Sequence, residues 1–219
     1  MRLLIKLEKI KNNKIVFDAN ILMCGIERSE EEYSFECMKE CFLNHVFSYF
    51  ENILIHEAVF YEVSDDRKEY LRNFIGKNLT IVGEGDLYNH DPIYNRIFNS
   101  IAKYDLFDYE RSSIAFKDNP SKNRGEVFSL AYAAYHKIPF FSSRDGSANS
   151  AVKELKELKS INLVGFEYCL IIGYLNNQGN SIIKKRIKSL YKTYCAPEIK
   201  RGAIPGTFSD FFTRYVSNI

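Results

Sequence analysis

The chain has 219 residues, of which 46% are hydrophobic and 15% are aromatic. This composition excludes an intrinsically disordered chain, and the length suffices for one large domain or one domain with an appendage. The formal net charge of +2 excludes recognition of nucleic acid through overall charge, so any basic surface must be local.

Residues 1–13 precede the first clear strand and form an N-terminal extension. Their apolar run is short and meets charge at once, so we expect no signal peptide, no membrane contact and a cytoplasmic protein. The five cysteines lack the spacing of a zinc site or a disulfide framework. We expect Cys37 and Cys41, four residues apart, to be small buried residues in a reducing compartment.

The first strand is predicted at 15–17, where Ile, Val and Phe follow one another without polar alternation. It stops at Asp18, which precedes Ala19, Asn20 and apolar residues at helical spacing. In open α/β folds, ligands bind at the carboxyl edge of the sheet. A carboxylate at that edge, directly after a buried strand, has no evident structural duty, so Asp18 is the leading candidate for a site residue.

A second strand is predicted at 52–56 and a helix at 57–75. Glu62 falls in the second turn of this helix, near the strand end. The alternative is that Glu62 is a solvated helix residue beside Asp65 and Asp66.

The next elements carry no candidate acid. We predict a strand at 79–83 and a helix at 88–104, with apolar positions Ile93, Ile97 and Ile101 at a spacing of four. The stretch 104–122 is the least regular and includes clear turn chemistry.

Two further acids follow. Glu126 lies in the first turn of a predicted helix, 124–137, although it could also close a capping box with Asn123. Asp145 comes after a predicted strand at 138–142. It could alternatively cap the helix predicted at 147–157.

With a last strand at 161–164, strands alternate with helices, which predicts an α/β fold with a mostly parallel, helix-covered sheet. Four carboxylates meeting at one edge would repel each other, and a divalent cation removes that conflict. Acids without His or Cys favour Mg²⁺ or Mn²⁺. Such a metal activates water and stabilises charge on a phosphodiester, so we predict metal-dependent phosphodiester hydrolysis. The predicted ligands, which are also the catalytic residues, are Asp18, Glu62, Glu126 and Asp145.

The order of these motifs resembles the PIN domain, a family of metal-dependent nucleases. Asp18-Ala19-Asn20 is similar to its opening Asp-x-Asn motif, and Glu62 matches the acid on the following helix. Gly125-Glu126 resembles its third acid, and Ser143-Arg144-Asp145 its Ser/Thr-x-Asp strand end. The resemblance covers about residues 14–165, and the stretch 84–122 matches poorly.

The resemblance implies a PIN-like (Rossmann-like) three-layer α/β/α fold and an endoribonuclease that cleaves single-stranded RNA. It implies that Asn20 and Ser143 orient the metal ligands. It also implies a toxin of a toxin–antitoxin pair, with an antitoxin protein as partner; a homodimer stays open.

After residue 165 the predicted strands end and only helices follow. We predict a nuclease domain over 1–165 and a helical C-terminal extension over 166–219 that packs on it. The aromatic residues of the tail, 207–216, are expected to dock back on the body or to bind a partner.

A basic helix is predicted at 182–192, with Ser181 as its N-cap. Basic charge interleaved with tyrosine suits a phosphate backbone with stacked bases. The alternative is an amphipathic helix that buries Ile183, Ile187 and Leu190 and leaves its lysines solvated. Two arginines beside the acids are further candidates for phosphate contact. The predicted RNA-binding residues are Arg124, Arg144, Lys184, Lys185, Arg186 and Lys188.

Two other classes of function remain. A catalytically silent PIN-like module would bind RNA or protein without cleaving it. A phosphatase with a phosphoaspartyl intermediate would need a second Asp two residues after Asp18, and the chain has Asn20 there.

Overall fold

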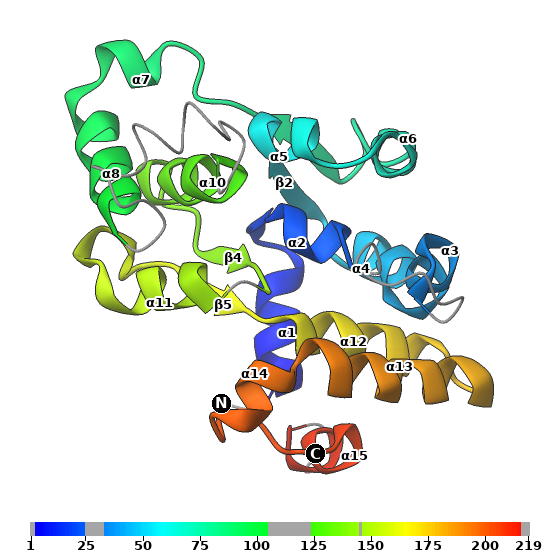
Figure 1. The fold of residues 1–219 in the computed structure, drawn as a ribbon. Helices are drawn as coiled ribbons and strands as arrows, with labels where there is room; N and C mark the ends of the chain where they lie inside the picture. Colours follow the sequence, from blue (N-terminus) through cyan, green and yellow to red (C-terminus); the bar gives the residue numbers. More distant parts are fainter. Residues whose placement is uncertain (1–2, 25–32, 105–123, 145, 216–219) are drawn as a thin grey trace. The chain divides into compact units, whose positions relative to one another are not determined.

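The computed structural model describes residues 3–24, 33–104, 124–144 and 146–215 (Figure 1). The chain forms two compact units, and each is built from separate segments. The first unit comprises Met1–Asn13, Met23–Glu51 and Gly165–Ile219. The second unit comprises Lys14–Leu22 and Asn52–Val164. The residues expected to form a C-terminal extension therefore share a unit with two segments from the N-terminal part of the chain.

The second unit contains a five-stranded sheet in which every neighbouring pair is parallel, in the order β3-β2-β1-β4-β5. The strands are β1 (Lys14–Phe17), β2 (Asn52–His56), β3 (Leu79–Val82), β4 (Phe140–Ser142) and β5 (Asn162–Val164). All five predicted strands are thus confirmed. The α/β class and the parallel sheet are confirmed too, and the arrangement is compatible with three layers.

Continuous apolar runs explain the strands, because a parallel sheet is buried on both faces. Ile15, Val16 and Phe17 of β1 are all fully buried. Val16, Leu54 and Phe141 belong to one core, which they share with helices of the same unit.

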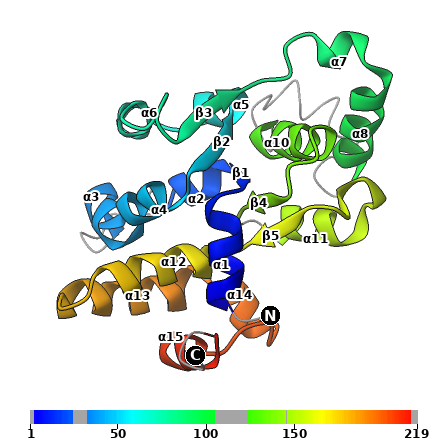
Figure 2. The same cartoon turned by 180° about the vertical axis from the view of Figure 1, so that it is seen from behind.

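The second unit also contains helices, several of which supply residues to this core. They are α2 (Ala19–Leu22), α5 (Glu57–Glu62), α6 (Asp65–Arg72), α7 (Leu87–His90), α8 (Pro92–Lys103), α10 (Arg124–Tyr135), α11 (Gly146–Glu154) and the short 3₁₀ helix η3 (Lys156–Leu158). Helix α10 packs on α8, α5 and β2, and both cartoon views show α8 and α10 side by side (Figures 1 and 2).

The predicted helix 57–75 is wrong as a single element. The chain is extended at Val63 and Ser64, which separates α5 from α6. Ser64 takes the N-cap position of α6, and Asp65 and Asp66 follow in its first turn. This order is typical of a helix start, because polar and acidic residues complement the free N–H groups there.

The apolar positions of the helix predicted at 88–104 differ in burial. Ile93 is 55% exposed, whereas Tyr94, Ile97 and Ile101 are buried. Steps of four residues overshoot the 3.6-residue turn by about 40° each, so the two steps from Ile93 to Ile101 turn by about 80° around the helix. Steps of three and four keep Tyr94, Ile97 and Ile101 on the core side.

The first unit is helical in its described residues. Its elements are α1 (Leu3–Lys11), α3 (Phe35–Met38), the π-helix η2 (Lys39–Leu43), α4 (Asn44–Tyr49), α12 (Phe166–Asn176), α13 (Ser181–Tyr194), α14 (Ala196–Lys200) and α15 (Phe208–Tyr215). Helix α12 packs on η2 at Gly173, where a Cβ atom would lie 2.0 Å from the backbone oxygen of Cys41. Only glycine permits this approach of two backbones. Cys37 and Cys41 are both buried, as predicted, with their sulfur atoms 3.7 Å apart.

Helix α13 buries an apolar face that includes Ile183, Ile187 and Leu190. Its N-cap is Asn180, whose side chain accepts a hydrogen bond from the Ile183 N–H at 3.1 Å, so the expectation of a Ser181 cap is wrong. Asn and Ser both cap helices well, and adjacent candidates leave the start ambiguous by one residue.

The aromatic tail docks within the first unit. Phe208 and Phe211 are buried, and Phe208 contacts the rings of Tyr174 and Tyr191. The tail therefore packs on α12 and α13. Across the described ranges, no helix combines the length and the apolarity needed to cross a membrane.

Candidate functional site

Polar residues end four neighbouring strands at the carboxyl edge of the sheet. Phe17 of β1 is paired with Ile55 of β2 and Ser142 of β4, so Asp18 is flanked by the next residues, His56 and Ser143. Neighbouring strands lie about 4.8 Å apart, so these three backbones are adjacent. Beyond His56, Glu84 follows the end of β3.

Asp18 is 4% exposed and is held on both carboxylate oxygens. Its Oδ1 accepts a hydrogen bond from the Ala19 N–H at 2.7 Å, and its Oδ2 accepts one from the Ser143 hydroxyl at 3.0 Å. The Asp18 N–H donates to the Ser142 carbonyl at 3.0 Å. The carboxylate is therefore fixed in orientation by the first residue of α2 and by the residue that follows β4.

Asn20 joins the same network from α2. Its Nδ2 donates to the Ser143 Oγ at 2.9 Å, and its Oδ1 accepts from the Arg144 N–H at 2.8 Å. The structure thus brings Asp18, Asn20 and Ser143 together, although 123 positions separate Asn20 from Ser143. In this arrangement Ser143 orients the carboxylate and Asn20 orients Ser143.

Glu62 lies at the end of α5 and contacts the start of α10. Its Oε1 accepts a hydrogen bond from the Gly125 N–H at 2.8 Å, so it is not simply a solvated helix residue. Burial raises the pKa of the Glu62 carboxyl, while the Gly125 N–H and the charges of Arg124 and His56 act in the opposite direction. Glu126, the residue after Gly125, is 6% exposed in the first turn of α10.

The donor chemistry of these residues suits a hard divalent cation, since Asp18, Glu62 and Glu126 offer only oxygen. The fourth predicted ligand, Asp145, lies outside the described residues, as does Asn123 of the alternative capping box. Within the described part of the chain, no three His, Cys, Asp or Glu side chains gather closely enough to hold a metal ion. The four-carboxylate metal site therefore remains a prediction.

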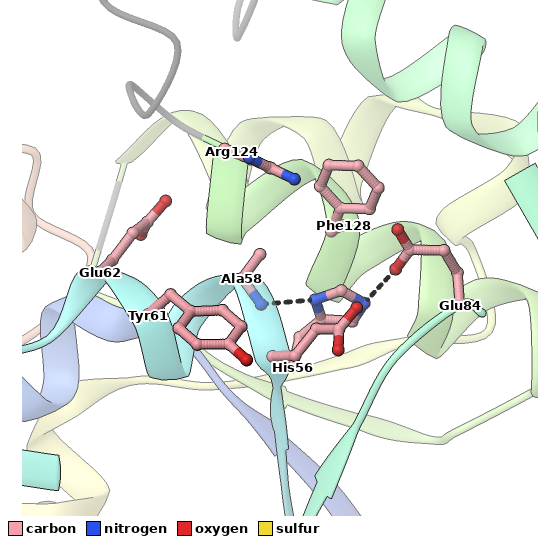
Figure 3. A pocket seen from close by; sticks show the side chains of 8 residues that line it. His56, Ala58, Tyr61, Glu62, Glu84, Arg124 and Phe128 are labelled. Atoms are coloured by element: carbon pink, nitrogen blue, oxygen red, sulfur yellow. Dashed lines mark hydrogen bonds and ion pairs between the residues drawn. The ribbon is translucent and has the colours of Figure 1, made fainter.

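A pocket of about 540 Å³ adjoins Glu62 in the second unit (Figure 3). Its residues come from the end of β2, from α5, from the segment after β3 and from the first two turns of α10. The lining residues are His56, Glu57, Ala58, Tyr61, Glu62, Glu84, Arg124 and Phe128.

A buried histidine organises this pocket. His56 is 1% exposed, and its Nδ1 accepts a hydrogen bond from the Ala58 N–H at 3.1 Å, which caps α5. The other ring nitrogen, Nε2, consequently carries the proton and donates to the Glu84 carboxylate, 2.8 Å away. Burial opposes ionisation of Glu84, but the hydrogen bonds from His56 and from the Glu84 backbone N–H, together with the charges of His56 and Arg124, hold the pKa of Glu84 below its usual range.

Aromatic rings complete the walls of the pocket. Phe128 stacks on His56 with ring centroids 5.4 Å apart, and the Arg124 guanidinium lies 5.5 Å from the Phe128 centroid. Tyr61, which is 73% exposed, lies on the side of the pocket opposite Phe128 (Figure 3).

Neither His56 nor Glu84 was among the residues predicted from the sequence. The signal for His56 is present, because it ends an apolar strand just as Asp18 does. The sequence gives no such signal for Glu84, because only the pairing of β2 with β3 brings Glu84 close to His56.

The predicted RNA-binding residues have differing surroundings. Lys184 lies over the Tyr174 ring, 4.6 Å from its centroid, and Arg186 lies 3.9 Å from the Glu40 carboxylate. Lys185 and Lys188 are exposed on α13. These four residues belong to the first unit, whereas Arg124 and Arg144 belong to the second.

Comparison with known proteins identifies no family for this chain. No protein-family model matches it, and no curated protein and no solved structure matches it either. Its function must therefore be inferred from its own residues and their geometry.

Proposed function

We propose that this protein is a PIN-like, Mg²⁺- or Mn²⁺-dependent endoribonuclease that cleaves single-stranded RNA in the cytoplasm. The observation that carries the proposal is the buried, oriented carboxylate of Asp18 at the carboxyl edge of an all-parallel sheet. This is the edge where α/β folds bind ligands. The order of the other acids along the chain supports the same function.

Each residue has a role in this proposal. Asp18, Glu62, Glu126 and Asp145 would hold the metal. When bound, the metal supplies a water of lowered pKa and neutralises charge on the phosphodiester. Ser143 and Asn20 keep Asp18 oriented through hydrogen bonds of 3.0 and 2.9 Å.

The cations have a separate role in binding the RNA. In the sequence, Arg124 lies two residues before Glu126, and Arg144 lies directly before Asp145. In these positions the two arginines would contact phosphates near the cleaved bond. The exposed Lys185 and Lys188 on α13 would attract the backbone further along the strand.

The test is cleavage of labelled single-stranded RNA in Mn²⁺, Mg²⁺ or EDTA by the wild type and by Asp18→Asn. We expect cleavage only with metal, and a loss of more than about 100-fold in the variant, because even residues that merely support a ligand contribute 10–100-fold. Ser143→Ala should fall within that smaller range. Calorimetric titration should show that Ser143→Ala binds Mn²⁺ more weakly than the wild type does, and that Asp18→Asn binds it most weakly.

The matched control is Asp65→Asn, which removes the same charge from a fully exposed side chain of the second unit. It should cleave and bind Mn²⁺ as the wild type does. Wild-type protein that neither binds Mn²⁺ nor cleaves any RNA would overturn the proposal and favour a catalytically silent binding module.

A further inference from the structure

The pocket beside α5 has a lining that RNA hydrolysis does not require. Its volume of about 540 Å³ falls in the range of small-molecule sites. Three carboxylates line it, those of Glu57, Glu62 and Glu84, against the single guanidinium of Arg124. His56 accepts a hydrogen bond at Nδ1 and is therefore neutral. When the three carboxyls are ionised, two negative charges of the lining have no positive counterpart in the pocket.

The two carboxylates of α5 lie close to glycine backbone. A Cβ atom at Gly83 would lie 2.7 Å from the carboxyl carbon of Glu57, and a Cβ atom at Gly125 would lie 2.6 Å from a carboxylate oxygen of Glu62. Because glycine has no side chain, it leaves room for both acids at the wall of the pocket. The fold therefore places two carboxylates along one helix, facing the same cavity.

These two carboxylates can accept hydrogen bonds from a ligand. Within the described part of the chain, neither Glu57 nor Glu62 forms an ion pair with a lysine or arginine. Burial raises the pKa of the Glu62 carboxyl, and a bound cation would relieve this cost of ionisation. Glu84 differs, because His56 and its own backbone N–H already donate to it. It adds negative charge to the pocket, and the contacts with a ligand fall to Glu57 and Glu62.

The spacing of the acids selects the shape of the cation. Among the described residues, the carboxylates of this pocket do not gather closely enough to hold a single metal ion. Figure 3 shows Glu62 and Glu84 on opposite sides of the pocket. Glu57 and Glu62 are five positions apart on α5, which is about 7.5 Å along the helix axis. A cation that contacts both must be extended and must carry positive charge at two ends.

We propose that the pocket binds an aliphatic diamine as a dication, with one ammonium group on Glu57 and the other on Glu62. Its two charges match the two uncompensated charges of the lining, whereas a lysine side chain of a partner protein would bring only one. Tyr61, one turn after Glu57 and 73% exposed, offers its ring to the methylene chain and to an ammonium group. This inference goes beyond the proposed ribonuclease function and does not depend on it.

The test is calorimetric titration of the full chain in EDTA, without RNA. The probes are putrescine, a four-carbon diamine, and two matched monoamines, N-acetylputrescine and butylamine. We expect one putrescine to bind per chain, about tenfold more tightly than either monoamine, because the second ammonium group adds a hydrogen bond between charged groups. Equal binding of the three amines would overturn the proposal and favour a lysine side chain as the ligand. No binding of putrescine at millimolar concentration would overturn it as well.

The key variant is Glu57→Gln, which keeps the shape of an exposed side chain and removes its charge. The advantage of putrescine over the monoamines should disappear. Glu69→Gln makes the same chemical change at an exposed position of α6 and should retain the advantage. An unchanged preference in Glu57→Gln, or an equal loss in both variants, would overturn the proposal. If Glu57→Gln fails to fold, the comparison of the three amines in the wild type still decides.

The two proposals can fail separately, because the amine titration uses neither metal nor RNA. Selective binding of putrescine by a chain that cleaves no RNA would refute the ribonuclease and support the diamine site. Metal-dependent cleavage by a chain that binds the three amines equally would refute the diamine site and support the ribonuclease.

Discussion

At the scale of single residues, a backbone N–H group fixes the position of a candidate metal ligand. Gly125 donates to the Glu62 carboxylate at 2.8 Å. A Cβ atom at this position would lie 2.6 Å from the other carboxylate oxygen and 2.8 Å from a Val59 methyl group. Position 125 thus requires glycine, because a larger residue would collide with Glu62 and Val59. This contact explains why glycine precedes Glu126 at the start of α10.

Gly125→Ala should displace Glu62 and destabilise the fold. Overpacking of this kind costs about 1–3 kcal/mol in the free energy of unfolding, which urea titration measures. Binding of Mn²⁺ should weaken as well. Gly146→Ala is the control, because an added Cβ there meets nothing within 4 Å and alanine favours the helix α11. Wild-type stability and Mn²⁺ binding in Gly125→Ala would contradict the requirement for glycine.

Asp91 makes the stability of the second unit depend on pH. Its carboxylate accepts from the Tyr135 hydroxyl at 2.7 Å and from the N–H groups of Ile93 and Tyr94, and these bonds lower its pKa below 3.8. A lowered folded pKa stabilises the protein above the unfolded value and loses that contribution as the pH falls through the folded value.

We therefore expect the wild type to exceed Asp91→Asn in unfolding free energy at neutral pH. The difference should shrink as the pH falls below about 3.8, and urea titrations across this range measure it. The Tyr135 hydroxyl is the largest cause of the shift, so in a Tyr135→Phe background the pH dependence should be weaker. A difference that grows on acidification would contradict this account.

At the scale of elements, a four-residue helix carries Asn20 and depends on a neighbour for its position. Helix α2 is too short to be stable by itself. Its last carbonyl, that of Leu22, accepts from the Nε of the buried Arg67 at 2.9 Å. Arg67 thereby links α6 to the helix that follows Asp18.

Arg67→Met should preserve most of the packing and leave the Leu22 carbonyl without this donor. Losing a buried hydrogen bond to a charged group costs about 1–3 kcal/mol, which urea titration measures. Cleavage should fall as well, since Asn20 loses its support. Arg72→Met alters an exposed arginine at the end of the same helix and should change neither property. Equal effects from the two variants would show that Arg67 acts through general charge.

Individual elements differ in how well the sequence predicts them. Strands buried on both faces appear as apolar runs, so β1 and β2 were predictable. The break between α5 and α6 was missed, because the chain becomes extended at Val63 and Ser64 and a new helix starts at Asp65, which the apolar pattern does not mark. In the candidate site, a local motif indicated Asp18, whereas the pairing of His56 with Glu84 depends on which strands become neighbours.

At the scale of the whole molecule, the cysteines divide unequally between the units. All five lie in the first unit, and each is at most 3% exposed. The Cys37 hydrogen bond and burial raise the pKa of Cys41, and burial raises the pKa of Cys195. Because the thiolate is the reactive form, opening of the first unit must precede modification.

We expect a thiol reagent to react slowly with the native protein and at once in denaturant. The measurement is the absorbance over time of the thiolate that a disulfide reagent releases when it reacts with a cysteine. Ser48→Cys places a thiol at an exposed position of α4 and is the control for reagent access. A native cysteine that reacts as fast as this control would contradict the need for opening.

The segmented first unit bears on how the chain folds as the ribosome makes it. Segment Met23–Glu51 emerges early, but Gly173, which packs against Cys41, emerges only after the second unit is complete at Val164. At ordinary elongation rates this interval is roughly 6 to 24 seconds. Phe42 and Phe47, buried in the finished protein, have no α12 to pack on during that time. The nascent chain is therefore expected to need a chaperone between these two points of its synthesis.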